Sequence, residues 1–247
     1  QTRARETPDG YALSGSKIWI SNATVASFFV VFAKTDLEAG RKGISAFVVE
    51  RDSPGVTVGK PLPKLGQRSS HAAEIFFDNV TVPRENLLGA EGEGFLIAMQ
   101  VFDRSRPVIA ANGVGLIQRC LDESLTYASE RPTMGQTIIQ HQSIANKLAE
   151  MGMRGEAARL LTYQSAALHD AGQRNTLQAA YAKLMAADSA MWAATEAIQI
   201  FGGAGYSEEF PVAKLFRDAK LLQIYEGTSE IQHNIIAREL ARGMARG

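Results

Sequence analysis

A change of hydrophobic period near residue 90 restricts the fold of this chain more than any other feature of its sequence. Up to residue 88, apolar residues come in short runs of β-branched and aromatic side chains that turn residues separate, which is typical of strands. From about residue 91 onward, apolar residues recur at the spacing of one helix face. The sequence therefore predicts an α+β protein of two domains, a β domain over residues 1–88 and a helical domain over residues 91–247.

Four runs carry the strand prediction, namely "YALSGSKIWIS", "FFVVFAKTD", "ISAFVVERD" and "EIFFDNVTVP". They are short, they follow one another at regular spacing, and turn residues such as Ser53-Pro54-Gly55 close them. This pattern favours a small barrel or a sandwich, and both interpretations stay open.

Capping and breaking residues divide the second half into four or five long helices. The first should cover about 92–130 and should kink at Pro107. A later helix should begin after Asn175, a good N-cap residue, and stop at Gly202-Gly203. Long helices with short connections predict an antiparallel four-helix bundle.

The last two helices should flank a short turn, "YEGTSEIQ". Pro211 suits the first turn of one helix, and Ser229 followed by Gln232 matches a capping box that opens the next. Glu226 thus precedes a helix N-terminus, whose partial positive charge favours an ionised carboxylate, and Gly227 lets the backbone approach a ligand. A solvated turn charge and a base aimed at a substrate both agree with this segment.

Composition limits the class of protein. The 26 basic and 26 acidic residues cancel, which argues against a general nucleic-acid or membrane-surface binder. Cys120 is the single cysteine, so no disulfide can form within one chain, and a reducing compartment is expected. We expect no membrane span, no signal peptide and no metal site. The start at Gln1, without Met, indicates a piece of a longer or a processed protein.

Six segments of the chain resemble the acyl-CoA dehydrogenases, most of all the medium-chain branch and its bacterial relatives. They are "KIWISNA", "LGQRSSHAAEIFFDNVTVPRENLLG", "GEGFLIAMQVFDRSRPVIAA", "ERPTMGQTIIQHQ", "QIFGGAGY" and "DAKLLQIYEGTSEIQ". They stand in the family's order and spacing and cover nearly all of the chain. The resemblance implies a middle β domain and a C-terminal four-helix bundle, and it implies that the family's N-terminal helical domain would precede Gln1.

The same resemblance implies a base and a substrate site. Family enzymes remove the α-proton of an acyl-CoA thioester with the glutamate that Glu226 matches, and the β-hydrogen leaves as hydride to N5 of FAD, giving a trans-2-enoyl-CoA. Some branches place the base on an earlier helix, where this chain has Ser105, so Glu226 is the candidate in register. The implied substrate-binding positions are Asp103, Arg106, Tyr225 and Gly227. Asp103 and Arg106 could equally belong to a solvated helix face.

An FAD site is also implied. The matching positions are Trp19, Ser21, Arg131, Thr133, His141, Gln142, Gln199, Gly202, Gly203 and Thr228. Trp19 and Ser21 match residues that lie against the flavin ring, and Arg131 and Thr133 match residues that hold the FAD pyrophosphate of a neighbouring subunit. Without the resemblance, Trp19 would suit the core of a barrel, and His141 would suit a helix surface or a core position with satisfied hydrogen bonds.

The implied protein is an FAD-dependent acyl-CoA dehydrogenase of fatty acid β-oxidation. The resemblance further implies a homotetramer that passes electrons to an electron-transfer flavoprotein, in the bacterial cytoplasm or the mitochondrial matrix of a eukaryote. Two alternatives stay open, an acyl-CoA oxidase-like flavoprotein and a truncated oligomerisation scaffold without activity of its own. Acyl chain length is not predicted, because packing along several helices sets the depth of the pocket.

Overall fold

The structure, a computed structural model, describes residues 2–244 and divides into two compact units. The sheet unit comprises the residues up to Lys64 together with Arg68–Val101. The helical unit comprises Leu65–Gln67 and the residues from Phe102 onward. Within the described residues, no helix combines the length and the apolar character that crossing a bilayer requires.

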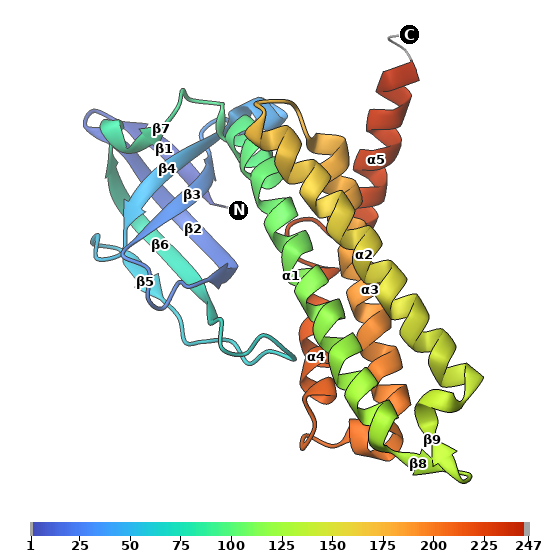
Figure 1. Cartoon of the computed structure of the whole chain (residues 1–247). Coiled ribbons are helices and arrows are strands. Elements are labelled where there is room, and N and C mark those ends of the chain that lie inside the picture. Colours follow the sequence, from blue (N-terminus) through green and yellow to red (C-terminus); the bar gives the residue numbers. More distant parts are fainter. Residues whose placement is uncertain (1, 245–247) are drawn as a thin grey trace. The chain divides into compact units, whose positions relative to one another are not determined.

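Seven strands of the sheet unit form one sheet in the order β5-β6-β2-β1-β3-β4-β7 (Figure 1). The strands are β1 (Arg3–Thr7), β2 (Gly10–Ser21), β3 (Phe28–Lys34), β4 (Ile44–Glu50), β5 (Val56–Val58), β6 (Ala72–Pro83) and β7 (Leu87–Leu88). Neighbouring strands pair antiparallel, except β1 and β3, which pair parallel. Each of the four predicted runs contains one long strand, β2, β3, β4 or β6, so the predicted strand positions are confirmed.

Buried and exposed side chains alternate along the strands of the sheet unit, and the buried ones form its core. In β3, the side chains of Phe29 and Val31 are buried while those of Phe28 and Val30 are exposed. Because successive side chains of a strand point to opposite faces, this alternation places one face of β3 on the core. The pairing of β2 with β6 breaks register between Lys17 and Ile20, at the position of Trp19.

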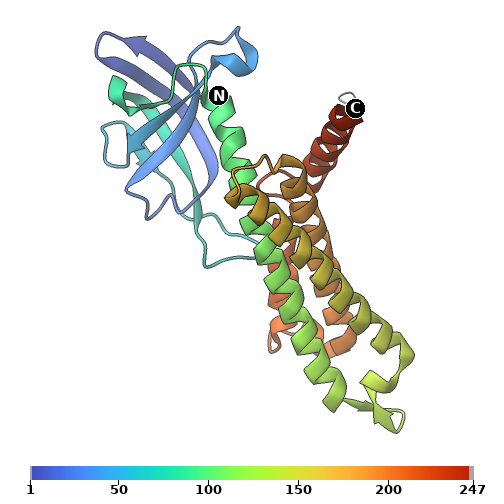
Figure 2. The ribbon, with the colours of Figure 1, turned by 45° about the horizontal axis from the view of Figure 1, so that its top comes forward.

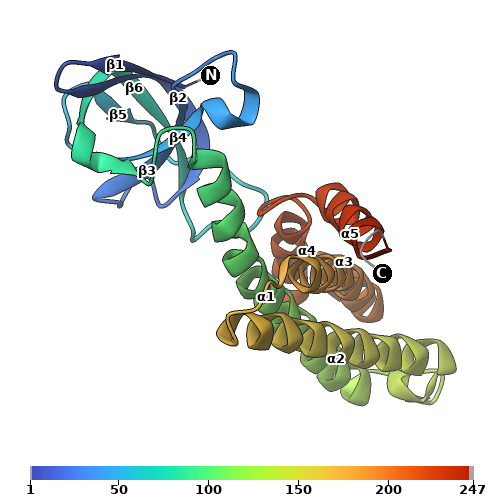
Figure 3. The ribbon, with the colours of Figure 1, turned by 90° about the horizontal axis from the view of Figure 1, so that it is seen from above.

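The helical unit holds most of α1 (Gly94–Glu130), and all of α2 (Gln142–Asp170), α3 (Thr176–Phe201), α4 (Pro211–Leu222) and α5 (Ser229–Met244). A hairpin of β8 (Pro132–Thr133) and β9 (Gln136–Thr137) connects α1 to α2. Helices α1, α2 and α3 lie side by side (Figures 1 and 2), and α4 and α5 lie on the side of α3 away from α2 (Figure 3). The predicted helix stop at Gly202 and the start at Pro211 are confirmed.

Small residues let α3 pack closely at the centre of this unit. Its buried face is dominated by alanine, and a Cβ added to Gly113 of α1 would stand 2.9 Å from Cβ of Ala186. Between α1 and α2, a Cβ on Gly155 would stand 3.1 Å from Ile117. Close helix packing therefore leaves little room for larger side chains at these positions.

Helix α1 continues through Pro107 as a single element. Proline has no N–H, so the carbonyl of Asp103, four residues earlier, loses its partner within the helix. The side-chain amide of Asn175 donates to that carbonyl at 3.1 Å and also to the Ser165 carbonyl at 3.2 Å. Asn175 does stand at the N-cap position of α3, but its side chain does not cap the helix.

The predicted capping box at the start of α5 is wrong. The hydroxyl oxygen of Thr228 accepts from the Ile231 N–H at 3.4 Å. The Ser229 hydroxyl instead donates to Asp188 at 2.9 Å, and the Gln232 amide donates to backbone carbonyls of the preceding turn. Asp188 of α3 and the carbonyls of the turn thus bind the two side chains that the capping box would need.

Candidate active site

The turn between α4 and α5 presents Glu226 on a left-handed backbone. The φ angle of Glu226 is 56° and that of Gly227 is 90°. A non-glycine residue in this conformation costs on the order of 1 kcal/mol and persists only where its surroundings impose it. Gly227 also needs to lack a side chain, because a Cβ there would stand 2.7 Å from Nε2 of Gln232.

The carboxylate of Glu226 is half-buried against α1. The Ser105 hydroxyl donates to its Oε2 at 2.5 Å. No other side chain of the described residues donates to this carboxylate, so Oε1 stays available as a proton acceptor. The serine at the alternative base position therefore contacts the candidate base.

Arg106 and Asp103 do not lie on a solvated helix face. The side chain of Arg106 is buried, its Nε donates to the Glu226 carbonyl at 3.4 Å, and its Nη1 pairs with Asp103 at 3.3 Å. Asp103 also accepts from the Thr176 hydroxyl at 2.6 Å. Burial lowers the pKa of Arg106, while the charges of Asp103 and Glu226 raise it. The cation therefore sits directly behind the backbone of the candidate base.

Two further residues beneath the turn were missed by the sequence interpretation. Lys183 of α3 is 0% exposed, and its Nζ donates to the Gly227 carbonyl at 2.7 Å. Gln232, also 0% exposed, donates from Nε2 to the carbonyls of Glu226 at 3.3 Å and Gly227 at 2.9 Å. Burial lowers the pKa of Lys183 to about 8. In the sequence, the burial of Lys183 was indicated only by its position on an alanine-rich face of the predicted helix.

Both ends of the turn are held by one carboxylate of α3. Asp188 accepts from the amide of Gln223 at 2.8 Å and from the hydroxyl of Ser229 at 2.9 Å. Tyr225 is half-buried, and burial raises the pKa of its phenol. The turn is therefore fastened from α3 at its start, centre and end.

A second group of predicted residues gathers at the hairpin end of the helical unit. Arg131 and Thr133 lie on the exposed hairpin, His141 and Gln142 at the start of α2, and Gln199, Gly202 and Gly203 at the end of α3. Tyr127 of α1 stacks on Phe201 of α3 with ring centroids 4.1 Å apart, which brings these chain segments together.

The side chains at the hairpin end suit a bound phosphate-containing cofactor. Among the described residues Arg131 makes no ion pair, so its guanidinium can bind a phosphate in a bidentate manner. Nε2 of His141 is buried without a hydrogen-bond partner, while its Nδ1 lies 3.2 Å from the Gln136 amide. A buried polar atom without a partner is costly unless a ligand satisfies it. The residues present therefore fit such a group.

The turn and the hairpin end stand far apart along α1. Ser105 contacts Glu226 near one end of the helix, and Arg131 directly follows the other end. At the rise of an α-helix, the intervening residues span about 37 Å. The turn and the hairpin end therefore lie at different parts of the helical unit.

In the sheet unit, Trp19 combines exposure with backbone strain. Its φ angle is 63° and its side chain is 60% exposed, at the register break between β2 and β6. The core interpretation of this residue is wrong, since its indole is outside the packed interior. Ser21 is exposed two residues later. An exposed aromatic plane on a strained residue suits contact with a flat ring.

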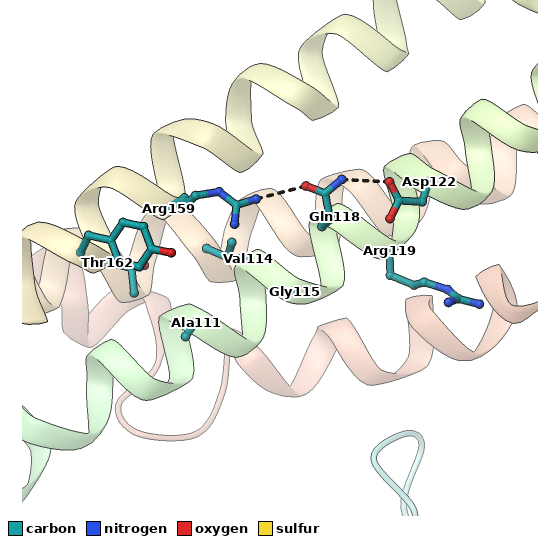
Figure 4. A pocket seen from close by; sticks show the side chains of 9 residues that line it. Ala111, Val114, Gly115, Gln118, Arg119, Asp122, Arg159 and Thr162 are labelled. Carbon is teal, nitrogen blue, oxygen red and sulfur yellow. Dashed lines mark hydrogen bonds between the residues drawn. The ribbon is translucent and has the colours of Figure 1, made fainter.

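A groove of about 450 Å³ between α1 and α2 lies apart from the predicted positions (Figure 4). Arg159 donates to Gln118 at 3.1 Å, and Gln118 donates to Asp122 at 2.9 Å along this groove (Figure 4). No predicted site residue lines it, so we assign it no part in the candidate active site.

Known proteins match this chain over nearly its whole length. The family profile described as "Acyl-CoA dehydrogenase, C-terminal domain" matches residues 92–241, and "Acyl-CoA dehydrogenase, middle domain" matches residues 1–80. The chain is 47% identical to cyclohexane-1-carbonyl-CoA dehydrogenase of Geobacter metallireducens, over 99% of this chain and 64% of that protein.

Solved structures give the same result. Butyryl-CoA dehydrogenase from Megasphaera elsdenii is 46% identical with a TM-score of 0.95, over 98% of this chain and 63% of that chain. A chain of the structure described as the electron transferring flavoprotein of Acidaminococcus fermentans is 43% identical with a TM-score of 0.95, over 98% and 64%. The chain spans just under two thirds of the length of the curated relatives that it matches. By these matches, the chain belongs to the acyl-CoA dehydrogenase family.

Proposed function

We propose that the protein containing this chain is an FAD-dependent acyl-CoA dehydrogenase that converts a saturated acyl-CoA thioester to a trans-2-enoyl-CoA, with Glu226 as the base. The observation that carries this proposal is the half-buried Glu226 carboxylate, presented on a left-handed residue and contacted by Ser105 where other branches hold the base. As part of the same proposal, the seven strands close into a small barrel and the helices form an antiparallel four-helix bundle.

In the proposed reaction, the α-proton of the thioester moves to a carboxylate oxygen of Glu226. The Ser105 hydroxyl holds Oε2 at 2.5 Å, which fixes the side chain and leaves Oε1 to accept the proton. Buried Arg106 donates to the Glu226 carbonyl and so holds the backbone from which the carboxylate extends. An α-proton beside a thioester is a weak acid, so backbone N–H groups of the turn must stabilise charge on the thioester oxygen, at about 3 kcal/mol per donor.

FAD, when bound, supplies the acceptor for the two electrons and the β-hydrogen. We propose that Trp19 and Ser21 contact its ring and that Thr228 contacts it from the turn. Arg131 and Thr133 would hold its pyrophosphate, with His141 and Gln142 beside them. Gln199, Gly202 and Gly203 would lie against its adenosine.

The distance along α1 between the Glu226 turn and the hairpin end supports a role for neighbouring copies of the chain. Because Ser105 and Arg131 lie about 37 Å apart at the rise of a helix, the hairpin end is proposed to serve the FAD of a neighbouring subunit. This supports an oligomer, proposed as a homotetramer, in which each site is incomplete without a partner. The proposed electron acceptor is an electron-transfer flavoprotein.

Glu226→Gln in the FAD-loaded protein tests the assignment of the base. We expect kcat for a saturated acyl-CoA to fall about 10³-fold, since general-base catalysis contributes on this order, while the flavin absorbance spectrum is retained. Glu156→Gln is the control, because Glu156 is an exposed glutamate of α2 that pairs with Arg159 and should leave kcat unchanged. Turnover of Glu226→Gln near that of the control would refute the assignment.

A further inference from the structure

Lys183 is a buried cation whose partner is the active-site turn. It lies in the first third of α3, and the residue and its neighbours Ala182 and Ala186 are fully buried. Within residues 2–244, no carboxylate stands within ion-pair distance of its Nζ. Its hydrogen bond goes to the Gly227 carbonyl at 2.7 Å. The ammonium therefore donates to the backbone oxygen of Gly227, the residue after the candidate base.

Packing alone does not account for a lysine at this position. Removing an ammonium from water is costly, and an apolar side chain of similar length usually serves stability as well or better. The carbonyl of Gly227 already accepts from Gln232 at 2.9 Å, so it would keep a partner without the lysine. A residue that costs stability at a site is expected to serve the chemistry of that site.

The contact with Gly227 restricts the orientation of Glu226. Lys183 and Gln232 hold the carbonyl after Gly227, while Arg106 and Gln232 hold the carbonyl before it. Both peptide planes around Gly227 are thereby fixed. The relative orientation of those planes sets the left-handed conformation of Gly227, and Glu226, which shares the first of the two planes, is held by the same contacts.

We propose that Lys183 is a positioning residue, which holds the Gly227 carbonyl from beneath the turn and thereby fixes the place of the Glu226 carboxylate for proton abstraction. This inference rests on the proposed function, because it takes Glu226 as the base. It predicts that Lys183 raises the rate of the reaction and does not raise the stability of the protein.

Lys183→Met in the FAD-loaded, full-length protein tests the inference, with Lys147→Met as the matched control. Methionine keeps the length and removes the donor, and Lys147 is a partly buried lysine of α2 that pairs with Glu196. We expect kcat to fall about 10²-fold, the loss that a small misplacement of a reacting group causes, with KM nearly unchanged. Hydrogen exchange of the segment 221–232 should accelerate, while the melting temperature stays equal or rises. The control should change neither kcat nor the exchange of that segment.

A double-mutant comparison shows whether Lys183 acts through Glu226. In the Glu226→Gln background, Lys183→Met should lower the remaining turnover less than about threefold, since the group that it positions is already gone. An unchanged kcat, or a kcat loss accompanied by a lower melting temperature and faster exchange throughout the helical unit, would overturn the inference. If Lys183→Met does not fold, Lys183→Gln is measured against the same criteria. Turnover retained by Glu226→Gln alone would refute the proposed base, and that outcome is read separately from the Lys183 variants.

Discussion

Replacing Lys183 by methionine should change how the stability of the protein depends on pH. Burial lowers the pKa of Lys183 from 10.5 to about 8 in the folded protein. Between these values the unfolded chain carries a proton on Lys183 that the folded chain has lost. Unfolding therefore takes up a proton, and the free energy of unfolding rises with pH across this window. Since each pKa unit corresponds to about 1.4 kcal/mol, the rise is on the order of 3 kcal/mol.

The measurement is urea unfolding of wild type and Lys183→Met between pH 7 and pH 10, followed by circular dichroism. The free energy of unfolding of the variant minus that of wild type should fall by about 2 to 3 kcal/mol over this range, because only wild type is relieved of the buried charge. Groups facing Lys183, namely Asp188, Arg106, Glu226 and Glu230, are present in both proteins. Tyr225 and Cys120, whose pKa values burial raises, also titrate in both, so their effects cancel in the difference. A difference that stays constant with pH would refute the argument that the Lys183 ammonium is buried at a cost.

Two predictions concern the cofactor and the electron acceptor. Arg131→Ala should weaken FAD binding about 10-fold or more, as expected for a lost charged hydrogen bond. The control is Arg159→Ala, which removes a half-buried arginine of the groove between α1 and α2. Equilibrium dialysis with FAD measures the affinity, and light scattering that finds only monomers would contradict the role across subunits. After anaerobic reduction by substrate, flavin absorbance should recover faster with an electron-transfer flavoprotein than with oxygen, and Trp19→Ala should slow the partner reaction alone. Equal reoxidation by oxygen would favour the oxidase alternative.

The positions of the elements follow from local signals in the sequence. Short β-branched runs predicted β2, β3, β4 and β6, because each run needs only its own alternation to become a strand. Gly202 ends α3 in the left-handed conformation, and Pro211 opens α4, since glycine and proline fix backbone angles irrespective of distant contacts.

The hydrogen bonds at the start of α5 and the burial of Lys183 depend on tertiary contacts, so the local sequence did not predict them. Ser229 and Gln232 form a capping pattern in sequence, but Asp188 and the turn carbonyls offer them other partners once α3 packs nearby. Lys183 looks like an ordinary helix lysine until α5 covers it. Glu226 was singled out by the resemblance of its turn to the family sequence. The residues that hold the turn were not, because they lie far away in the sequence or inside an adjacent helix.

The proline in α1 also fixes how far that helix can slide against α3. Because Pro107 leaves one carbonyl of the helix without its usual donor, the Asn175 amide has a single preferred docking point along α1. A slip by one helical turn, about 5.4 Å, would leave the Asp103 carbonyl unsatisfied, while the amide would keep only its partners on Ser165. Ser105 lies two residues after Asp103 in α1. The contact between the Asp103 carbonyl and Asn175 therefore also sets the position of the serine opposite Glu226.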